Sequence, residues 1–204
     1  MFSLNELLDI VIMTLAIGFI FKDVFMPKRH TIVDTDHYDP LAHYRSMGNR
    51  IGSRIDINGF VFAMIITAPA VILHEFGHKL LALQYGMSAE FHAAYFWLGL
   101  GVLLKLLNFG FIFFVPAYVS ISGSGLTYFQ SSAIAFAGPA VNLLLFIVPF
   151  VLLKNAAFRK KYKKYLSILF LTSRINLFLF VFNMLPLPMF DGWKVFSGLI
   201  HAFF

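Results

Sequence analysis

Two histidines and a glutamate fall within five positions of one apolar segment, in the pattern H-E-x-x-H at His74, Glu75 and His78. If the segment is an α-helix, four residues advance it by about 400°, so the two histidines share one face and can converge on one metal ion. Glu75 then stands beside them, where it can act as general base toward a water molecule. Zinc in a hydrolytic site takes three protein ligands and keeps one position open. The pattern therefore predicts a zinc centre that needs one more protein ligand.

The best candidate for the third ligand is Asp191, the one acidic residue in the second half of the chain. The chain has no cysteine, so thiolate ligands are excluded and the ligand must be His, Asp or Glu. Glu90 would lie about three turns beyond His78 if that helix continued, which is too far, and the remaining acids lie in or beside the first polar loop. The alternative for Asp191 is an Asp-Gly turn that closes a helix, because a glycine follows it and prolines precede it.

The alternative for the histidine pair is a chance match, since short patterns of this kind also occur in ordinary helices. The apolar surroundings argue against it. Charged groups at the centre of a membrane helix cost roughly 2.5–3.5 kcal/mol each on insertion scales. Two histidines and a glutamate in such a helix therefore need compensation, and a bound metal supplies it.

The chain that must position these residues is strongly apolar. Its 204 residues are 59% hydrophobic and 13% charged, whereas soluble domains have about 25% charged residues. Several apolar runs approach the roughly 20 residues that cross a bilayer, so we expect one integral membrane domain over residues 1–204. The net charge of +6 does not indicate nucleic-acid binding, because the basic residues lie in short loops between apolar segments, where they face lipid headgroups.

The hydrophobic pattern predicts an all-α polytopic membrane protein with about five to six membrane helices. The clearest ones are expected at residues 4–21, 59–85, 131–153 and 165–185. The first of them lacks a basic start and a cleavage pattern, so we expect a retained anchor rather than a signal peptide.

Three other segments are not predicted to be regular membrane helices. Residues 22–56 are polar and are expected outside the membrane. Glycines interrupt residues 94–121, which predicts a short or re-entrant helix followed by a strand-like stretch at 111–121. The block Lys154–Lys164 holds six basic residues and no acid, and is expected to form a solvated loop at one membrane face.

Three motifs together resemble the signatures of the site-2 protease family of intramembrane zinc metalloproteases. They are H-E-F-G-H at 74–78, F-A-G-P-A-V-N at 136–142 and N-M-L-P-L-P-M-F-D-G at 183–192. The resemblance covers about residues 60–197, which we take as the catalytic core, and it points to a short archaeal type without a PDZ or CBS domain. Substrate selection is then expected to use the membrane domain or a regulatory membrane partner.

The resemblance implies roles for six residues. The motifs assign one catalytic zinc ion to His74, His78 and Asp191, with Glu75 as the base. Asn183 corresponds to the family asparagine that helps to bind or polarise the scissile peptide. Asn142 corresponds to the asparagine of the G-P-x-x-N signature, for which two readings stay open: a hydrogen bond that bridges helices, or a contact with substrate.

The expected function is that of a zinc metalloendopeptidase that hydrolyses peptide bonds in or near transmembrane segments of membrane proteins, as in regulated intramembrane proteolysis. We expect a multi-pass protein in the cell membrane of a prokaryote, with membrane lipid around it and no nucleic-acid partner. Two other classes remain open: a membrane metal-ion transporter, which would move zinc without cleaving peptides, and a non-catalytic relative that binds membrane proteins.

The orientation in the membrane receives two conflicting indications. Basic loops favour the cytoplasmic side, which predicts a cytoplasmic Lys154–Lys164. Alternation of the flanking helices places Asp191 at the opposite face, whereas the zinc site of the resembling family lies nearer the cytosol. We give slightly more weight to the family pattern.

Overall fold

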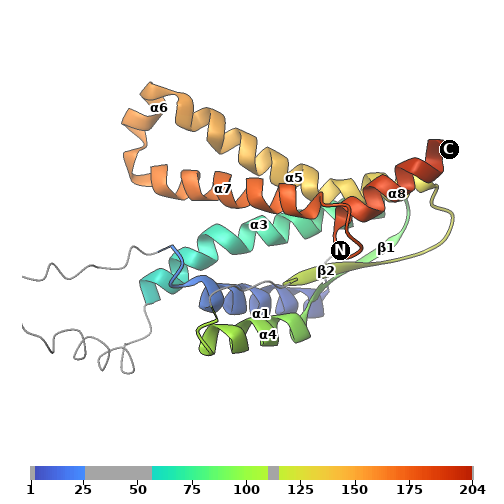
Figure 1. Ribbon diagram of the computed structural model, residues 1–204, viewed down its shortest axis with the longest axis horizontal. Coiled ribbons are helices and arrows are strands. Elements are labelled where there is room, and N and C mark those ends of the chain that lie inside the picture. The colour runs from blue at the N-terminus through green and yellow to red at the C-terminus, as the bar shows by residue number, and fades with distance from the viewer. Residues whose placement is uncertain (1–2, 26–56, 110–114, 204) are drawn as a thin grey trace, which may run out of the picture.

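The computed structural model describes residues 3–25, 57–109 and 115–203, which form a helical assembly with one small sheet (Figure 1). In chain order, the elements are α1 (Leu4–Phe21), α3 (Ile57–Gln84), β1 (Ser88–Ala93), α4 (Tyr95–Leu106), β2 (Ala117–Ser122), α5 (Tyr128–Lys154), α6 (Ala156–Lys161), the 3-10 helix η1 (Lys163–Tyr165), α7 (Leu166–Asn183) and α8 (Asp191–Phe203). The predicted class, an all-α membrane protein with a small strand element, is confirmed.

Four helices in the described part of the chain are long and apolar enough to cross a membrane: α1, α3, α5, and α7 together with η1. The two shorter helices α4 and α8 have 12 and 13 residues. At 1.5 Å per residue they span about 18–20 Å, less than the roughly 30 Å of a bilayer core. In the described part of the chain, four helices are of spanning length, fewer than the five to six predicted, and α4 is a further apolar helix too short to span. Most of the predicted polar segment 22–56 lies outside the described residues.

The sheet contains a strand, β1, that was not predicted from the sequence. After α3 the chain turns at Gly86, whose φ of 78° favours glycine, and continues into β1. Glu90 therefore lies on a strand and not on a continued helix. β1 pairs with β2 in antiparallel register, with Phe91 opposite Val119. The predicted strand-like stretch at 111–121 is present from Ala117 on as β2, and residues 110–114 lie outside the described part.

Two buried acids at the start of α1 hold the outer edge of β1. A Glu6 carboxylate oxygen accepts the backbone N–H of Phe91 at 2.7 Å, and an Asp9 oxygen accepts that of Ala93 at 3.2 Å. Glu6 also forms a buried ion pair with Lys79 of α3. These contacts leave the far edge of β2 as the open edge of a sheet that has two strands in the described chain.

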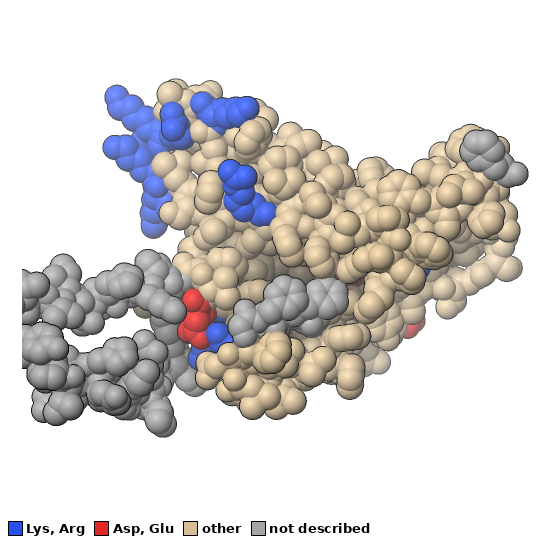
Figure 2. Space-filling model, in the orientation of Figure 1, with Lys and Arg blue, Asp and Glu red and all other residues tan. Residues whose placement is uncertain are grey.

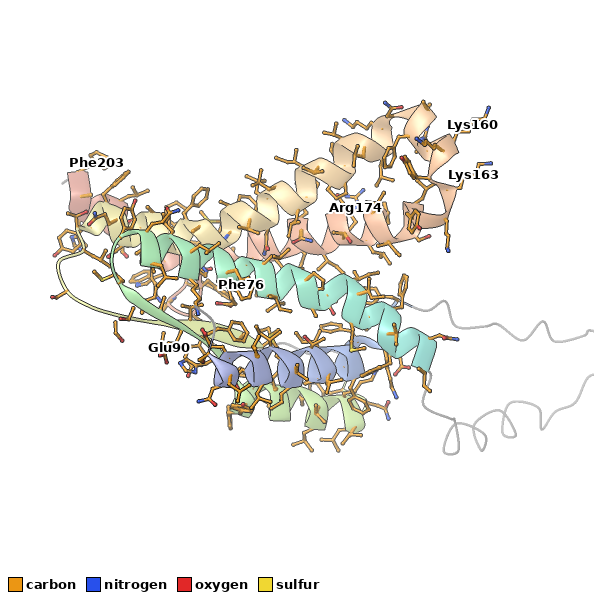
Figure 3. All side chains as sticks on the ribbon, turned by 180° about the vertical axis from the view of Figure 1, so that it is seen from behind. Phe76, Glu90, Lys160, Lys163, Arg174 and Phe203 are labelled. Carbon is orange, nitrogen blue, oxygen red and sulfur yellow. The ribbon has the colours of Figure 1, made fainter. Side chains whose placement is uncertain are left out.

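The six basic residues of the block Lys154–Lys164 lie at the end of the molecule opposite the sheet. Lys160 and Lys163 lie at the tip of the hairpin formed by α5 and α7, whereas Glu90 and Phe203 lie toward the other end (Figure 3). Figure 2 shows a cluster of Lys and Arg side chains on this tip. The predicted solvated loop at 154–164 is exposed, with no buried residue in α6 or η1, but it is built of short helices rather than irregular loop.

Candidate metal centre

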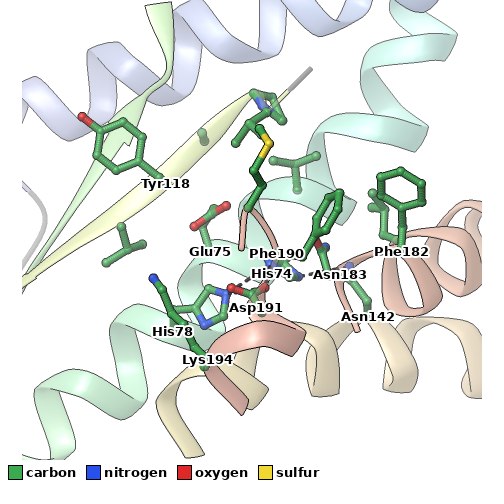
Figure 4. Close-up of a pocket in the computed structure, with 18 of the residues that line it drawn as sticks. His74, Glu75, His78, Tyr118, Asn142, Phe182, Asn183, Phe190, Asp191 and Lys194 are labelled. Carbon is green, nitrogen blue, oxygen red and sulfur yellow. Dashed lines mark hydrogen bonds and ion pairs between the residues drawn. The ribbon is translucent and has the colours of Figure 1, made fainter. Parts of the chain in front are cut away.

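Three potential metal ligands lie close together: His74 and His78 of α3, and Asp191 at the start of α8 (Figure 4). The Nε2 atom of His74 lies 3.1 Å from Oδ2 of Asp191 and 3.1 Å from Nε2 of His78. The Nε2 atom of His78 lies 3.3 Å from the same Asp191 oxygen. The three donor atoms therefore form a nearly equilateral triangle.

The triangle has the size that a tetrahedral zinc site requires. Nitrogen and oxygen ligands bind zinc at about 2.0–2.2 Å, so two of them at a tetrahedral angle lie roughly 3.3–3.5 Å apart. The separations of 3.1–3.3 Å come close to this value. Two imidazoles and one carboxylate also match the donor types of catalytic zinc sites, so the residues present fit the metal.

The N-terminus of α8 brings Asp191 to the histidines. Asp191 is the first residue of this helix. The alternative of an Asp-Gly turn that closes a helix is therefore wrong, because Asp191 begins one. Gly192 allows the first turn of α8 to approach the turn that follows α7, because a Cβ atom there would lie 2.6 Å from the carbonyl oxygen of Leu185. A larger residue at this position would push Asp191 away from the histidines.

Close packing of α5 against α3 sets the position of the histidine rings. A Cβ atom at Gly77 would lie 2.6 Å from the carbonyl oxygen of Ala137, and one at Gly138 would lie 2.8 Å from Cε1 of His74 and 2.6 Å from Cε1 of His78. Small residues are what allow two membrane helices to approach this closely. The glycine of the G-P-x-x-N motif, Gly138, therefore leaves the space that the two histidine rings occupy.

Each histidine also contacts α5 through its other ring nitrogen. The Nδ1 atom of His78 lies 2.7 Å from the carbonyl oxygen of Ile134. The Nδ1 atom of His74 lies 3.2 Å from the side-chain amide of Asn142, which is fully buried. This contact joins α5 to a candidate metal ligand on α3, as one of the two readings for Asn142 expected, and contact with substrate stays a prediction.

The three candidate ligands lie on the wall of a cavity of about 620 Å³. Glu75, which is 8% exposed, lines the same cavity. Asn183, the last residue of α7, lines it as well. All six residues singled out in the sequence therefore lie around one space, which is also bordered by the strand β2.

Comparison with known proteins gives two relatives. The chain is 36% identical over 194 residues to the protein named "Putative zinc metalloprotease MJ0611" of Methanocaldococcus jannaschii, a match that covers 95% of this chain and 84% of that protein. It is 29% identical over 144 residues to "Putative zinc metalloprotease sll0528" of Synechocystis, which covers 71% of this chain and 32% of the relative. The chain belongs to a family of zinc metalloproteases. No protein-family model and no solved structure matches it.

In this zinc metalloprotease the carboxyl group of Asp191 is suited to bind a cation. Burial raises the pKa of Asp191, but the neighbouring His74 and His78 side chains lower it more, so the pKa lies below its usual range. This direction favours the ionised form that a carboxylate ligand requires.

Two features of the metalloprotease site were not predicted from the sequence. Lys194 lines the cavity from α8, and its spacing of three residues from Asp191 would have placed both on one helical face. The carbonyl group of Ile134 carries no sequence signal, because every residue has one.

Proposed function

We propose that the protein is an intramembrane zinc endopeptidase of the site-2 protease type, acting on transmembrane segments of other proteins in the cell membrane of a prokaryote. The observation that carries this proposal is the meeting of a three-residue metal cluster with Glu75 in one cavity. Membership of a zinc metalloprotease family supports the hydrolytic chemistry.

The depth of the cluster supports a reaction within the membrane. His78 and His74 precede the end of α3 at Gln84 by six and ten residues, which corresponds to about 9 and 15 Å along the helix axis. α3 is one of the helices able to span a membrane. A peptide bond that reaches the histidines must therefore enter well below the end of the helix.

In the proposed mechanism, Glu75 carries the proton. A zinc ion held by His74, His78 and Asp191 would lower the pKa of a water molecule to about 7 and polarise a carbonyl oxygen. Glu75 accepts a proton from the attacking water and later passes it to the nitrogen of the leaving amine. Glu75 follows His74 in the sequence and lines the same cavity as the three candidate ligands, so both proton transfers would occur within one cavity.

Asn183 is proposed to hold the substrate. It lines the cavity from the end of α7, and its side-chain amide can donate a hydrogen bond to the scissile carbonyl or to the oxyanion that develops from it. Such a donor acts mainly in the transition state, where the negative charge is largest.

The substrate is proposed to bind as a strand beside β2. A peptide bond in a helix is shielded by its own hydrogen bonds, so the target segment must unwind before it can be attacked. Phe91 donates its N–H to Glu6, away from β2, so its partner Val119 also directs its backbone N–H and C=O away from β1. Ala117, Val119 and Ile121 line the cavity. An unwound segment added at this edge would gain backbone hydrogen bonds next to the metal cluster.

The test is cleavage of a tagged single-span substrate by the purified protein in detergent. We expect cleavage by the wild type, and loss of cleavage with a zinc chelator and in Glu75→Gln with zinc still bound. Glu90→Gln is the matched control, because this glutamate lies exposed on β1 outside the cavity, and it should cleave like the wild type. Full activity of Glu75→Gln would refute the role of the base. Zinc flux in vesicles without cleavage would favour a transporter, and partner binding without cleavage a non-catalytic relative.

A further inference from the structure

Both histidines of the cluster direct Nδ1 toward α5 and Nε2 toward Asp191. A neutral imidazole carries its single proton on one nitrogen and can bind a metal only through the other. The hydrogen-bond partner of Nδ1 therefore decides whether Nε2 can bind a metal. The structure gives this partner for each of the two rings.

For His78 the partner settles the proton position directly. The carbonyl oxygen of Ile134, 2.7 Å from Nδ1, can only accept a hydrogen bond. The Nδ1 atom of His78 must then carry the proton, which leaves the lone pair of Nε2 directed toward Asp191.

For His74 the partner is a carboxamide, which can present either a donor or an acceptor. With the amide nitrogen of Asn142 facing Nδ1, the ring would have to accept the hydrogen bond, and its proton would sit on Nε2 among the candidate ligands. In that orientation the oxygen Oδ1 of Asn142 is buried without a hydrogen-bond partner in the described structure. A half-turn of the carboxamide exchanges the two atoms, because its oxygen and nitrogen are nearly equal in size and position.

We propose that Asn142 is a positioning residue whose side-chain oxygen accepts the Nδ1 proton of His74 and thereby directs the Nε2 lone pair of His74 toward the metal. This inference rests on the proposed zinc function. α5 then accepts the Nδ1–H hydrogen bond of both rings, with a main-chain oxygen for His78 and a side-chain oxygen for His74. Ile134, Gly138 and Asn142 are four residues apart, so they follow one face of α5, and Gly138 leaves the space into which the rings fit.

The experiment measures zinc affinity of the full-length protein in detergent by competition with a chromophoric chelator. Partners of metal-bound histidines typically contribute 10–100-fold to affinity, so Asn142→Leu, which has similar volume and no acceptor, should bind zinc about 10–100-fold more weakly. Asn142→Asp keeps an acceptor at the same position and should stay within a few fold of the wild type. A purely structural asparagine would not be rescued in this way.

Asn176→Leu is the matched control. Asn176 of α7 is also fully buried and also has an unpartnered oxygen, but its amide donates to Thr172 on its own helix. Its loss should leave zinc affinity unchanged even if thermal stability falls. Wild-type affinity in Asn142→Leu, or equal weakness of Asn142→Asp and Asn142→Leu, would overturn the inference. A wild type that binds no zinc would overturn it together with the proposed function, whereas the expected affinities without peptide cleavage would count against the protease function alone.

Discussion

The Nε2 atom of His74 lies 3.1 Å from the Oδ2 atom of Asp191, although 117 positions separate the two residues in the chain. α3 supplies the histidine and the N-terminus of α8 supplies the aspartate. Since His78 contacts the same carboxylate oxygen, one aspartate closes the cluster.

Replacing Asp191 with asparagine should greatly weaken zinc binding. Asparagine keeps the shape of the side chain but removes the negative charge that faces both histidines. We expect a loss larger than the roughly 10–100-fold that outer hydrogen-bond partners contribute, measured by chelator competition. The exposed Glu90→Gln variant provides the control for loss of an acid elsewhere. Unchanged affinity in Asp191→Asn would remove Asp191 from the ligand set.

Replacing Gly138 with alanine should also disturb the metal centre. The added methyl group would lie within 2.8 Å of ring atoms of both histidines, so the rings or α5 must move. We expect weaker zinc binding and a lower melting temperature in detergent. Gly99→Ala in α4 is the matched control, because a Cβ atom there meets nothing within 4 Å, and a helical glycine replaced by alanine gains up to about 1 kcal/mol of helix stability. Equal behaviour of the two variants would show that the close approach has no consequence.

Replacing Val119 with proline should weaken substrate binding without loss of zinc. Val119 directs its N–H away from β1, so proline removes a donor from the open edge and leaves the pairing between β1 and β2 in place. We expect a higher KM for the single-span substrate. Val119→Thr, which retains the N–H and the β-branched shape, should keep the wild-type KM. A raised KM in both variants would indicate that the side chain, and not the strand edge, is recognised.

The two ends of the bundle should face opposite sides of the membrane. Because the chain has no cysteine, single cysteines can be placed at Ser124, in the exposed turn after β2, and at Lys160, on the basic tip. In sealed vesicles, a membrane-impermeant thiol reagent should label one of them from outside and the other only after the vesicles are opened. Labelling of Lys160→Cys from the cytoplasmic side would support the positive-inside orientation, and labelling of Ser124→Cys from that side would support the orientation of the site-2 proteases. Labelling of both from one side would contradict the arrangement of α5 and α7.

Apolar runs in the sequence were enough to locate the four helices of spanning length. The helix at 4–21 matches α1 residue for residue, and the other three agree within a few positions, because an apolar run long enough to cross a bilayer can satisfy its backbone only as a helix. The helical repeat places His74 and His78 on one face of α3. The helix α8, which begins at Asp191, was not predicted. The choice of Asp191 as third ligand came from elimination, since the second half of the chain contains no other acid.

Only the tertiary structure decided how these residues meet. That Asp191 reaches both histidines of α3 depends on the packing of α8 against α5, which no local pattern encodes. β1 could not be predicted from local sequence, because its edge is stabilised by Glu6 and Asp9 of α1, more than 80 positions away. The contact of Asn142 with His74 likewise exists only because α3 and α5 approach closely at glycines. Periodicity in a sequence specifies elements, whereas contacts between distant segments depend on how those elements pack.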